Sequence, residues 1–388
     1  MSDRLIQIPS LTQLRTHRSE KWRGFTNDIL PLPVAEMDFP VAAPIRQILT
    51  EMVAESDLGY LGPIPELGTS FAGFAKRRWN WDVNPLFVRA ATDVGVAVVE
   101  LLRVFTKPGD KVLYSSPIYQ NFYTWMRETK VEMVDAPLKM DRVAVDGTGW
   151  SHDWDAIENA YKNGIVVHLI CSPHNPLGKV YTREDLLRII ALAKQYNVVV
   201  ISDEIHAPLT FKEAQFIPFL SLGEDAANVG IAVSAASKGW NIAGLKCAII
   251  ISQNDRMHEK LNELAPAIHY RASLLGAFAT VAAFADSQAW LDEAIEILDE
   301  NRKLITNLIA QHIPMVGYFP PQASYLAWLD MSALNLGEDP GLALIEKAKV
   351  AFNSGHIYGE LGRHHVRLNF ATSPEIITEA IERIAKVI

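Results

Sequence analysis

Lys238 lies in a polar connection between two apolar runs, and this arrangement constrains the fold more than any other feature of the chain. Residues 228–233 and 247–251 have the length and composition of short strands that are covered on both faces. Between them, hydroxyl groups and glycines flank Lys238. Because lysine is rarely buried without a partner, this side chain is structural, a phosphate ligand, or an amine kept partly neutral for Schiff-base chemistry.

Short apolar runs and amphipathic stretches alternate through the first two thirds of the chain. Strands are predicted at 111–115, 131–135, 165–171 and 198–201, and helices at 44–56, from 117, at 154–161 and at 183–196. This alternation indicates a mostly parallel sheet covered by helices. From about residue 273 the pattern changes to helices at 275–285, 290–312, 342–352 and 374–388 with strands at 325–329 and 365–370. We therefore expect a second, α+β lobe, a hinge near residues 270–290, and an N-terminal arm over residues 1–33 that stays outside the core.

Composition excludes several classes of function. The formal charge of -9 over 388 residues, without a basic tract, argues against nucleic acid as a partner. No apolar run approaches the roughly 20 residues of a membrane span, and the N-terminus does not resemble a signal peptide. We expect a cytoplasmic protein in which Cys171 and Cys247 are buried free thiols. The histidines lack metal-ligand spacing, and residues 364–365 are expected on a polar turn.

Polar groups follow the predicted strands, where sheets of this class bind ligands. The glycine turn at residues 92–102 is either an ordinary helix start or an anion site formed by free amides. No dinucleotide or P-loop glycine motif is present. An aldehyde cofactor on a lysine would need a phosphate site, an aromatic stacking partner and a carboxylate beside its ring nitrogen. The strand-end groups that could supply these are Gly95, Val96, Ala97, Tyr119, Asn175, Asp203, His206, Lys238 and Lys246.

Five motifs in this order carry a resemblance to a known family. They lie at residues 34–39 (VAEMDF), 172–180 (SPHNPLGKV), 202–206 (SDEIH), 237–245 (SKGWNIAGL) and 366–370 (VRLNF). The chain resembles pyridoxal-phosphate enzymes of fold type I in the class I/II aminotransferase superfamily, most closely the MalY/PatB branch of cystathionine β-lyase-like C–S lyases. The resemblance implies a large domain (41–280) with a mostly parallel seven-stranded sheet, a small α+β domain (281–388), and an N-terminal arm or small-domain segment (1–40).

The resemblance also implies a role for each matching residue. Lys238 would hold pyridoxal 5'-phosphate as a Schiff base and act in catalysis together with Tyr119. The remaining cofactor contacts would be the stacked ring of Tyr119, Asp203 at the ring nitrogen, Asn175 and His206 near the phenolic oxygen, and Gly95, Val96, Ala97, Ser237 and Lys246 at the phosphate. Tyr60 would reach the phosphate in the neighbouring subunit of a homodimer. Arg367 would bind the substrate carboxylate, with backbone near Ala35, Tyr119 and Asn175 completing the substrate site.

Four positions depart from the family pattern. Lys246 stands where many relatives have arginine, and Ala235 where many aminotransferases have a phosphate-binding serine. Glu36 replaces an aspartate that is common in the branch. Pro208, directly after residues 203–207 (DEIHA), stands where several lyases have an aspartate.

The resemblance predicts cleavage of cystathionine or cysteine S-conjugates to thiol, pyruvate and ammonia, as in methionine biosynthesis. An aminotransferase would use the same residues, and a regulatory protein that retained the fold is a third reading.

Overall fold

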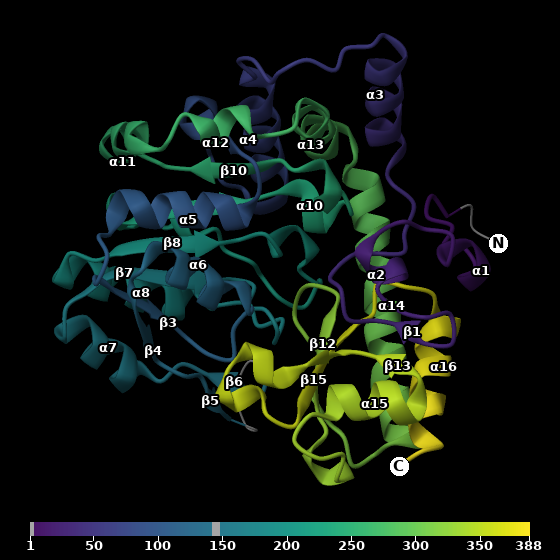
Figure 1. The fold of residues 1–388 in the computed structure, drawn as a ribbon. Coiled ribbons are helices and arrows are strands. Elements are labelled where there is room, and N and C mark those ends of the chain that lie inside the picture. Colours follow the sequence, from purple (N-terminus) through teal and green to yellow (C-terminus); the bar gives the residue numbers. More distant parts are fainter. Residues whose placement is uncertain (1–3, 142–147) are drawn as a thin grey trace.

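A seven-stranded mixed sheet forms the centre of the structure, a computed structural model that describes residues 4–141 and 148–388. The strand order is β2-β10-β9-β8-β7-β3-β4. β10 is antiparallel to both of its neighbours, and every other neighbouring pair is parallel, so the predicted mostly parallel sheet of seven strands is confirmed (Figure 1). The strands are β2 (Val88–Ala91), β3 (Lys111–Tyr114), β4 (Glu132–Asp135), β7 (Ile165–Cys171), β8 (Val199–Asp203), β9 (Gly230–Ser234) and β10 (Ala248–Ile251).

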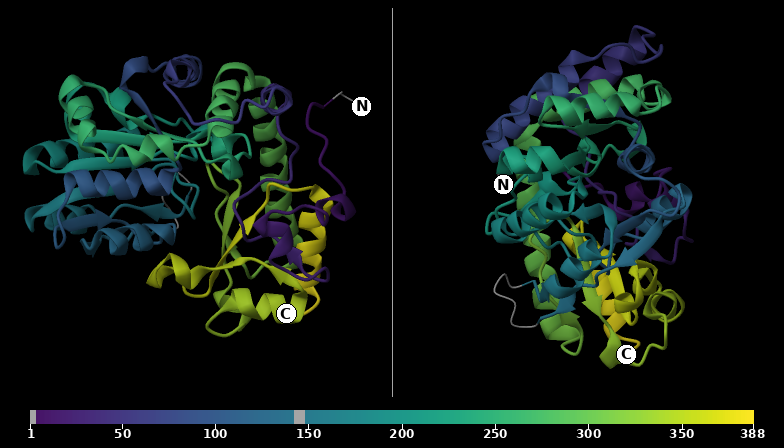
Figure 2. Two further views of the ribbon diagram at one scale, coloured as in Figure 1. Left: turned by 45° about the horizontal axis from the view of Figure 1, so that its top comes forward. Right: turned by 90° about the vertical axis from the view of Figure 1, so that its left-hand side faces the viewer.

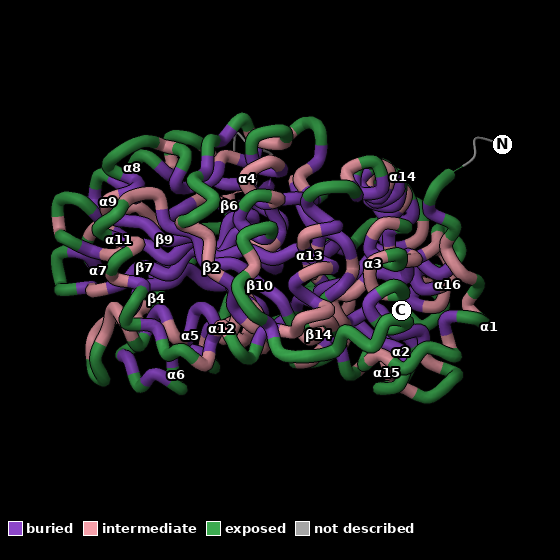
Figure 3. The backbone as a smooth tube through the Cα atoms, turned by 90° about the horizontal axis from the view of Figure 1, so that it is seen from above, coloured by how far each residue is buried: buried purple, intermediate pink, exposed green. Residues whose placement is uncertain are grey.

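Alternate side chains of these strands enter two hydrophobic cores, because successive residues of a strand point to opposite faces. In β10, Ile249 and Ile251 belong to one core, and Ala248 and Ile250 belong to the other. Figure 3 shows the buried residues in the strands and the exposed residues on the outer helices and turns. One face is covered by α5 (Val94–Phe105), α6 (Asn121–Thr129), α11 (Asp255–Lys260) and α12 (Ala267–Tyr270), and the other by α3 (Ala43–Ala54), α4 (Pro65–Trp79), α7 (Trp154–Lys162), α8 (Arg183–Tyr196), α9 (Glu224–Val229) and α13 (Leu274–Asp286).

A smaller antiparallel sheet lies in the C-terminal part of the chain, and it contains the two strands that the sequence predicts there. Its order is β11-β12-β15-β14, and all three neighbouring pairs are antiparallel. The strands are β11 (Gly317–Tyr318), β12 (Leu326–Asp330), β14 (Asn353–Ser354) and β15 (His365–Asn369), and the helices are α14 (Gln288–His312), α15 (Pro340–Ala348) and α16 (Pro374–Ala385). α13 and α14 meet at 81°. The domain limits at residues 40 and 280 remain a prediction.

The N-terminal residues pack into the core, so the expectation that residues 1–33 lie outside it is wrong. Leu14, Leu30 and Leu32 are fully buried. β1 (Leu30–Pro31) also pairs in parallel with β13 (Val350–Ala351), far away in the sequence. Figure 2 shows this N-terminal stretch, in purple, beside the yellow C-terminal helices. The stretch is mostly polar, but these few leucines are enough to join it to the hydrophobic core.

Three local predictions also need correction. The helix expected from residue 117 begins only at Asn121, so the preceding residues form a loop. The helix predicted over 342–352 ends at Ala348, because Lys349 adopts a left-handed conformation (φ 57°) and β13 follows. His365 lies in β15 and is buried, although the neighbouring His364 is on a turn. Val366 and Leu368 alternate with polar residues along β15 and are fully buried, and His365 is part of the same strand.

The described residues offer neither a single membrane-spanning helix nor a metal-binding cluster. No single helix in residues 4–141 and 148–388 is long and apolar enough to cross a membrane, and only the bent pair of α13 and α14 reaches that length and composition together. Within the same ranges, no group of three histidine, cysteine or acidic residues is arranged to hold a metal ion. Cys171 and Cys247 are buried free thiols, as expected.

Candidate active site

Lys238 lies at the edge of the large sheet, on a short helix between β9 and β10. This helix, α10 (Ala236–Gly239), begins two residues after the end of β9. The Lys238 Nζ donates a hydrogen bond of 2.7 Å to the carbonyl oxygen of Ala35. Burial lowers the pKa of Lys238 to about 8, and the nearby Arg367 cation acts in the same direction. A lysine amine with this pKa is partly neutral near physiological pH and can act as a nucleophile or base.

Asp203 ends the neighbouring strand β8, in register with Val233 of β9. Its Oδ1 accepts a hydrogen bond of 3.1 Å from the backbone amide of Ile205. Burial raises the pKa of Asp203 to about 7, while Lys238 opposes that rise. A buried carboxylate without a full charge partner is stabilised by a ligand that brings a cation, such as a protonated ring nitrogen.

Arg367, on β15 of the small sheet, and Asn175, on the turn after β7 of the large sheet, come together. Arg367, on β15, is 2 % exposed, and its Nη1 donates to the Asn175 Oδ1 at 3.1 Å. Its Nη2 donates to the carbonyl oxygen of Pro33 at 3.0 Å, and its guanidinium lies 5.2 Å from the centre of the Tyr358 ring. The Arg367 Nε has no hydrogen-bond partner among the described residues. A buried guanidinium with an unused donor is suited to a carboxylate ligand.

The N-terminus of α5 shows which backbone amides beside the predicted phosphate site have partners within the chain. The helix begins at Val94, with Asp93 as its N-cap. The Val96 amide therefore donates to the Asp93 Oδ1 at 2.8 Å, and the Ala97 amide makes an ordinary helical bond to the Asp93 carbonyl. The amides of Val94 and Gly95 are the first-turn donors that a helix leaves without internal partners. Gly95 belongs to this pair, and the other two residues predicted to hold the phosphate, Val96 and Ala97, follow it in the first turn.

Lys246 lies beside the same helix end. Its Nζ is 3.1 Å from the Asp93 Oδ2, and the two side chains are 56 % and 38 % exposed. Lysine and free helix amides both favour an anion at this place, whereas Asp93 opposes one. Ser237 is on α10, one residue before Lys238.

Tyr119 and His206 lie near these groups, and both are held by neighbouring side chains. Asn121 donates from Nδ2 to the Tyr119 hydroxyl at 2.8 Å, and burial raises the pKa of Tyr119. The His206 Nδ1 is 3.0 Å from the Ser324 Oγ, and burial lowers the pKa of His206 to about 3, so the ring is neutral. Tyr60, by contrast, is 93 % exposed on a loop and is not brought to the site within one chain.

The segment of residues 33–39 was only partly anticipated. Beside Lys238 and Arg367, four side chains bind its backbone, and one of them is Asn353, whose Nδ2 donates to the Pro33 carbonyl oxygen at 3.1 Å. The Tyr325 hydroxyl donates to the Ala35 carbonyl at 2.9 Å, and Asn369 donates to the carbonyls of Val34 and Glu36, each at 2.6 Å. Asn241 bonds both the amide and the carbonyl of Met37, at 2.8 and 2.9 Å. Asn241 lies three residues after Lys238 in a left-handed conformation (φ 58°). Asparagine adopts this conformation more readily than most residues, so an asparagine close to Lys238 was the signal in the sequence that could have pointed to this contact.

These residues fit a pyridine aldehyde that carries a phosphate. Lys238 supplies the amine, Asp203 a buried carboxylate, and Lys246 with the free amides of α5 an anion site. Arg367 supplies a separate carboxylate site. The fold and this donor set define a pyridoxal-phosphate-dependent enzyme of fold type I.

The chain belongs to the aminotransferase class I and II family, whose sequence description matches residues 33–384. It is 33% identical to a protein named cystathionine beta-lyase from Corynebacterium glutamicum, over 99% of this chain and 100% of that protein. It is 32% identical to cystathionine beta-lyase PatB of Bacillus subtilis (strain 168), over 92% of each chain. The crystal structure of cystalysin from Treponema denticola, which contains a pyridoxal 5'-phosphate cofactor, superposes with a TM-score of 0.90 at 28% identity, covering 100% of this chain and 99% of that one.

Proposed function

We propose that the protein is a pyridoxal-phosphate-dependent carbon–sulfur lyase that cleaves cystathionine or S-conjugates of cysteine by α,β-elimination. With cystathionine and water, the products are homocysteine, pyruvate and ammonia. The main supporting observation is that Lys238, with its lowered pKa, lies in one site with Asp203 and Arg367. Full-length relatives at 32% and 33% identity are named cystathionine beta-lyases.

The side chains divide the reaction between them. Bound pyridoxal phosphate supplies an electron sink for negative charge at the substrate Cα. Arg367 binds the substrate carboxylate, and its free Nε–H offers the additional donor of a bidentate contact. Lys238 removes the Cα proton, the Cβ–S bond breaks, and the leaving thiolate takes a proton from Lys238 or from Tyr119. Because burial raises the pKa of Tyr119, its hydroxyl stays protonated and able to donate.

The test is pyruvate release from L-cystathionine by the purified protein without an added keto acid. We expect pyruvate and free thiol in equal amounts, and the loss of both in Lys238→Ala. A protein that releases no pyruvate from cystathionine or cysteine conjugates, but forms pyridoxamine phosphate with an amino donor, would instead be an aminotransferase. That alternative is supported by the family description, and it uses Lys238 to return the proton to the cofactor carbon. A purely regulatory protein has no need of Lys238 and Asp203, which are both present.

The assembly and setting are part of the proposal. Tyr60, Leu58 and Val53 are large side chains exposed on α3 and the loop after it. A homodimer would cover them and would place Tyr60 at the phosphate of the partner's site. We place this dimer in the cytoplasm, with methionine biosynthesis as its role.

A further inference from the structure

The backbone of residues 33–39 joins the two side chains that would handle the substrate. The Ala35 carbonyl accepts from Lys238, and the Pro33 carbonyl accepts from Arg367. A shift of this backbone would therefore move the acceptor of the base and the acceptor of the carboxylate-binding arginine together. The contacts that fix the other end of the segment, at Asp38, therefore also affect the positions of these two acceptors.

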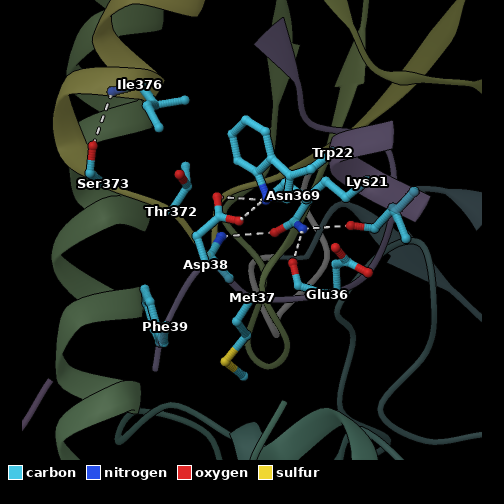
Figure 4. Close-up of polar contacts among 12 residues, drawn as sticks. Lys21, Trp22, Glu36, Met37, Asp38, Phe39, Asn369, Thr372, Ser373 and Ile376 are labelled. Atoms are coloured by element: carbon cyan, nitrogen blue, oxygen red, sulfur yellow. Dashed lines mark hydrogen bonds and ion pairs between the residues drawn. The ribbon is translucent and has the colours of Figure 1, made fainter. Parts of the chain in front are cut away.

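That far end is fixed by a buried ion pair. The Lys21 Nζ lies 2.7 Å from the Asp38 Oδ2, and the two side chains are 0% and 1% exposed. The indole Nε1 of Trp22 donates to the other carboxylate oxygen at 2.9 Å, and the Asp38 amide donates to the Ala371 carbonyl at 2.8 Å. Figure 4 shows Lys21, Trp22 and Asp38 converging beside the residues that follow β15. A second contact joins the same two stretches, because the Ser19 hydroxyl bonds the Glu36 carboxylate.

Stability alone is a poor explanation for this pair. Removing two charges from water costs several kcal/mol per ion, and well-packed apolar replacements of buried pairs are often neutral or stabilising. A buried pair does, however, fix geometry, because each charge tolerates only its partner at that place. Lys21 and Trp22 are the two buried residues of α2 (Glu20–Arg23). This helix is far in sequence from every residue of the predicted cofactor site.

We infer that Lys21 and Trp22 are positioning residues, which act through Asp38 to hold the 33–39 backbone in register with Arg367 and Lys238 for the substrate carboxylate. The inference rests on the proposed function of the site. It assigns them no part in cofactor binding, because Asp203, Lys246 and the start of α5 belong to the large sheet and its flanking elements, and α2 does not.

The test compares Asp38→Asn, Lys21→Met and the double variant Lys21→Met/Asp38→Asn, all loaded with pyridoxal phosphate. The single variants leave one buried polar partner unpaired and are expected to lose stability. The double variant contains no unpaired charge, and the asparagine introduced at position 38 can still accept from Trp22. In the double variant we expect KM for cystathionine to rise roughly tenfold or more, with kcat changed by less than about threefold. The cofactor absorbance and the dissociation constant of pyridoxal phosphate should stay at their wild-type values.

Binding of L-alanine, followed by its change in cofactor absorbance, gives a readout that does not depend on lyase activity. Its dissociation constant should rise with KM. Arg302→Met is the matched control, because Arg302 is a buried cation paired with Asp299 and Glu213 and bonded to the Pro321 carbonyl. It should lower Tm without raising the L-alanine dissociation constant.

Wild-type KM and L-alanine binding in the double variant would overturn the inference and leave the lyase proposal intact. A parallel loss of cofactor binding would also overturn it, since the pair would then be a general structural element. If the wild-type protein releases no pyruvate yet binds L-alanine, the lyase proposal fails and the L-alanine data still decide the inference.

Discussion

Asp203 and Glu204 are adjacent buried acids at the end of β8 with different surroundings. Asp203 interacts with Lys238, whereas Glu204 accepts hydrogen bonds from the Phe219 amide at 2.9 Å and the Ser202 hydroxyl at 3.0 Å. Burial raises the pKa of Glu204 to about 8, so that group is mostly protonated at neutral pH. The two residues therefore form a matched pair for substitution.

Asp203→Asn should lower kcat for pyruvate release by roughly a hundredfold or more, because a neutral amide cannot stabilise a protonated ring nitrogen. Glu204→Gln replaces a mostly neutral acid with a neutral amide and should change kcat by less than about threefold. Steady-state kinetics of both variants, each saturated with pyridoxal phosphate, checks the prediction. Equal losses in the two variants would contradict the role assigned to Asp203.

The lowered pKa of Lys238 predicts how the cofactor-free protein takes up pyridoxal phosphate. Only the neutral amine attacks an aldehyde, and burial keeps the Lys238 pKa near 8. The uptake rate should therefore rise about tenfold from pH 7 to pH 9 and level off above the pKa. Stopped-flow absorbance against pH measures it. A rate that continues to rise above pH 10 would indicate an ordinary, unshifted lysine.

At the scale of single elements, the first turn of α5 combines an N-cap with a predicted anion site. The Asp93 carboxylate caps the helix and pairs with Lys246, so a bound phosphate would have to share both with a fixed negative charge. Asparagine caps helices as well as aspartate does. Substitution by asparagine therefore removes the charge and keeps the helix start.

Asp93→Asn should tighten pyridoxal phosphate binding by roughly fivefold, because one repulsive charge near the helix N-terminus disappears. Absorbance titration of the cofactor-free protein measures the dissociation constant. Asp153→Asn is the control, since Asp153 caps α7 through the Ala156 amide and pairs with Lys139 in the same way, away from the site. Weaker binding in Asp93→Asn would mean that Asp93 serves chiefly to orient Lys246.

The sequence could predict the elements around the large sheet because each has a local signal. Apolar runs marked β7 to β10, and the ends of parallel strands placed Asp203, Asn175 and Lys238 at one edge of the sheet. The glycine turn indicated a helix start within residues 92–102, but it is the capping side chain of Asp93 that sets the first residue of α5 at Val94. The Lys21–Asp38 pair was missed because no periodicity or spacing encodes a contact between two isolated polar residues in different segments.

At the scale of the whole molecule, the proposed homodimer would complete the predicted phosphate site with Tyr60 of the neighbouring subunit, since Tyr60 is 93 % exposed in the single chain. Tyr60→Ala and Lys238→Ala homodimers should each have low activity. A mixed dimer would have one intact site, with Lys238 from one subunit and Tyr60 from the other. Its second site would lack both side chains. Mixing the two variants under subunit exchange should therefore restore pyruvate release, up to about a quarter of the wild-type level for random pairing. Absence of any restoration, with mixed dimers shown by mass spectrometry, would contradict a shared site.

The contacts of the N-terminal residues also order events during synthesis. β1 pairs with β13, and the Asp38 amide bonds the carbonyl of Ala371, so these early residues find their partners only when residues much later in the chain have been made. Domains tend to fold as they emerge from the ribosome, and long-range contacts form late. The part of the large sheet that holds Lys238 can thus fold before Arg367 has been synthesised. If Arg367 has the role proposed for it, a chain released before residue 367 would carry a reactive amine without the group that selects amino acids.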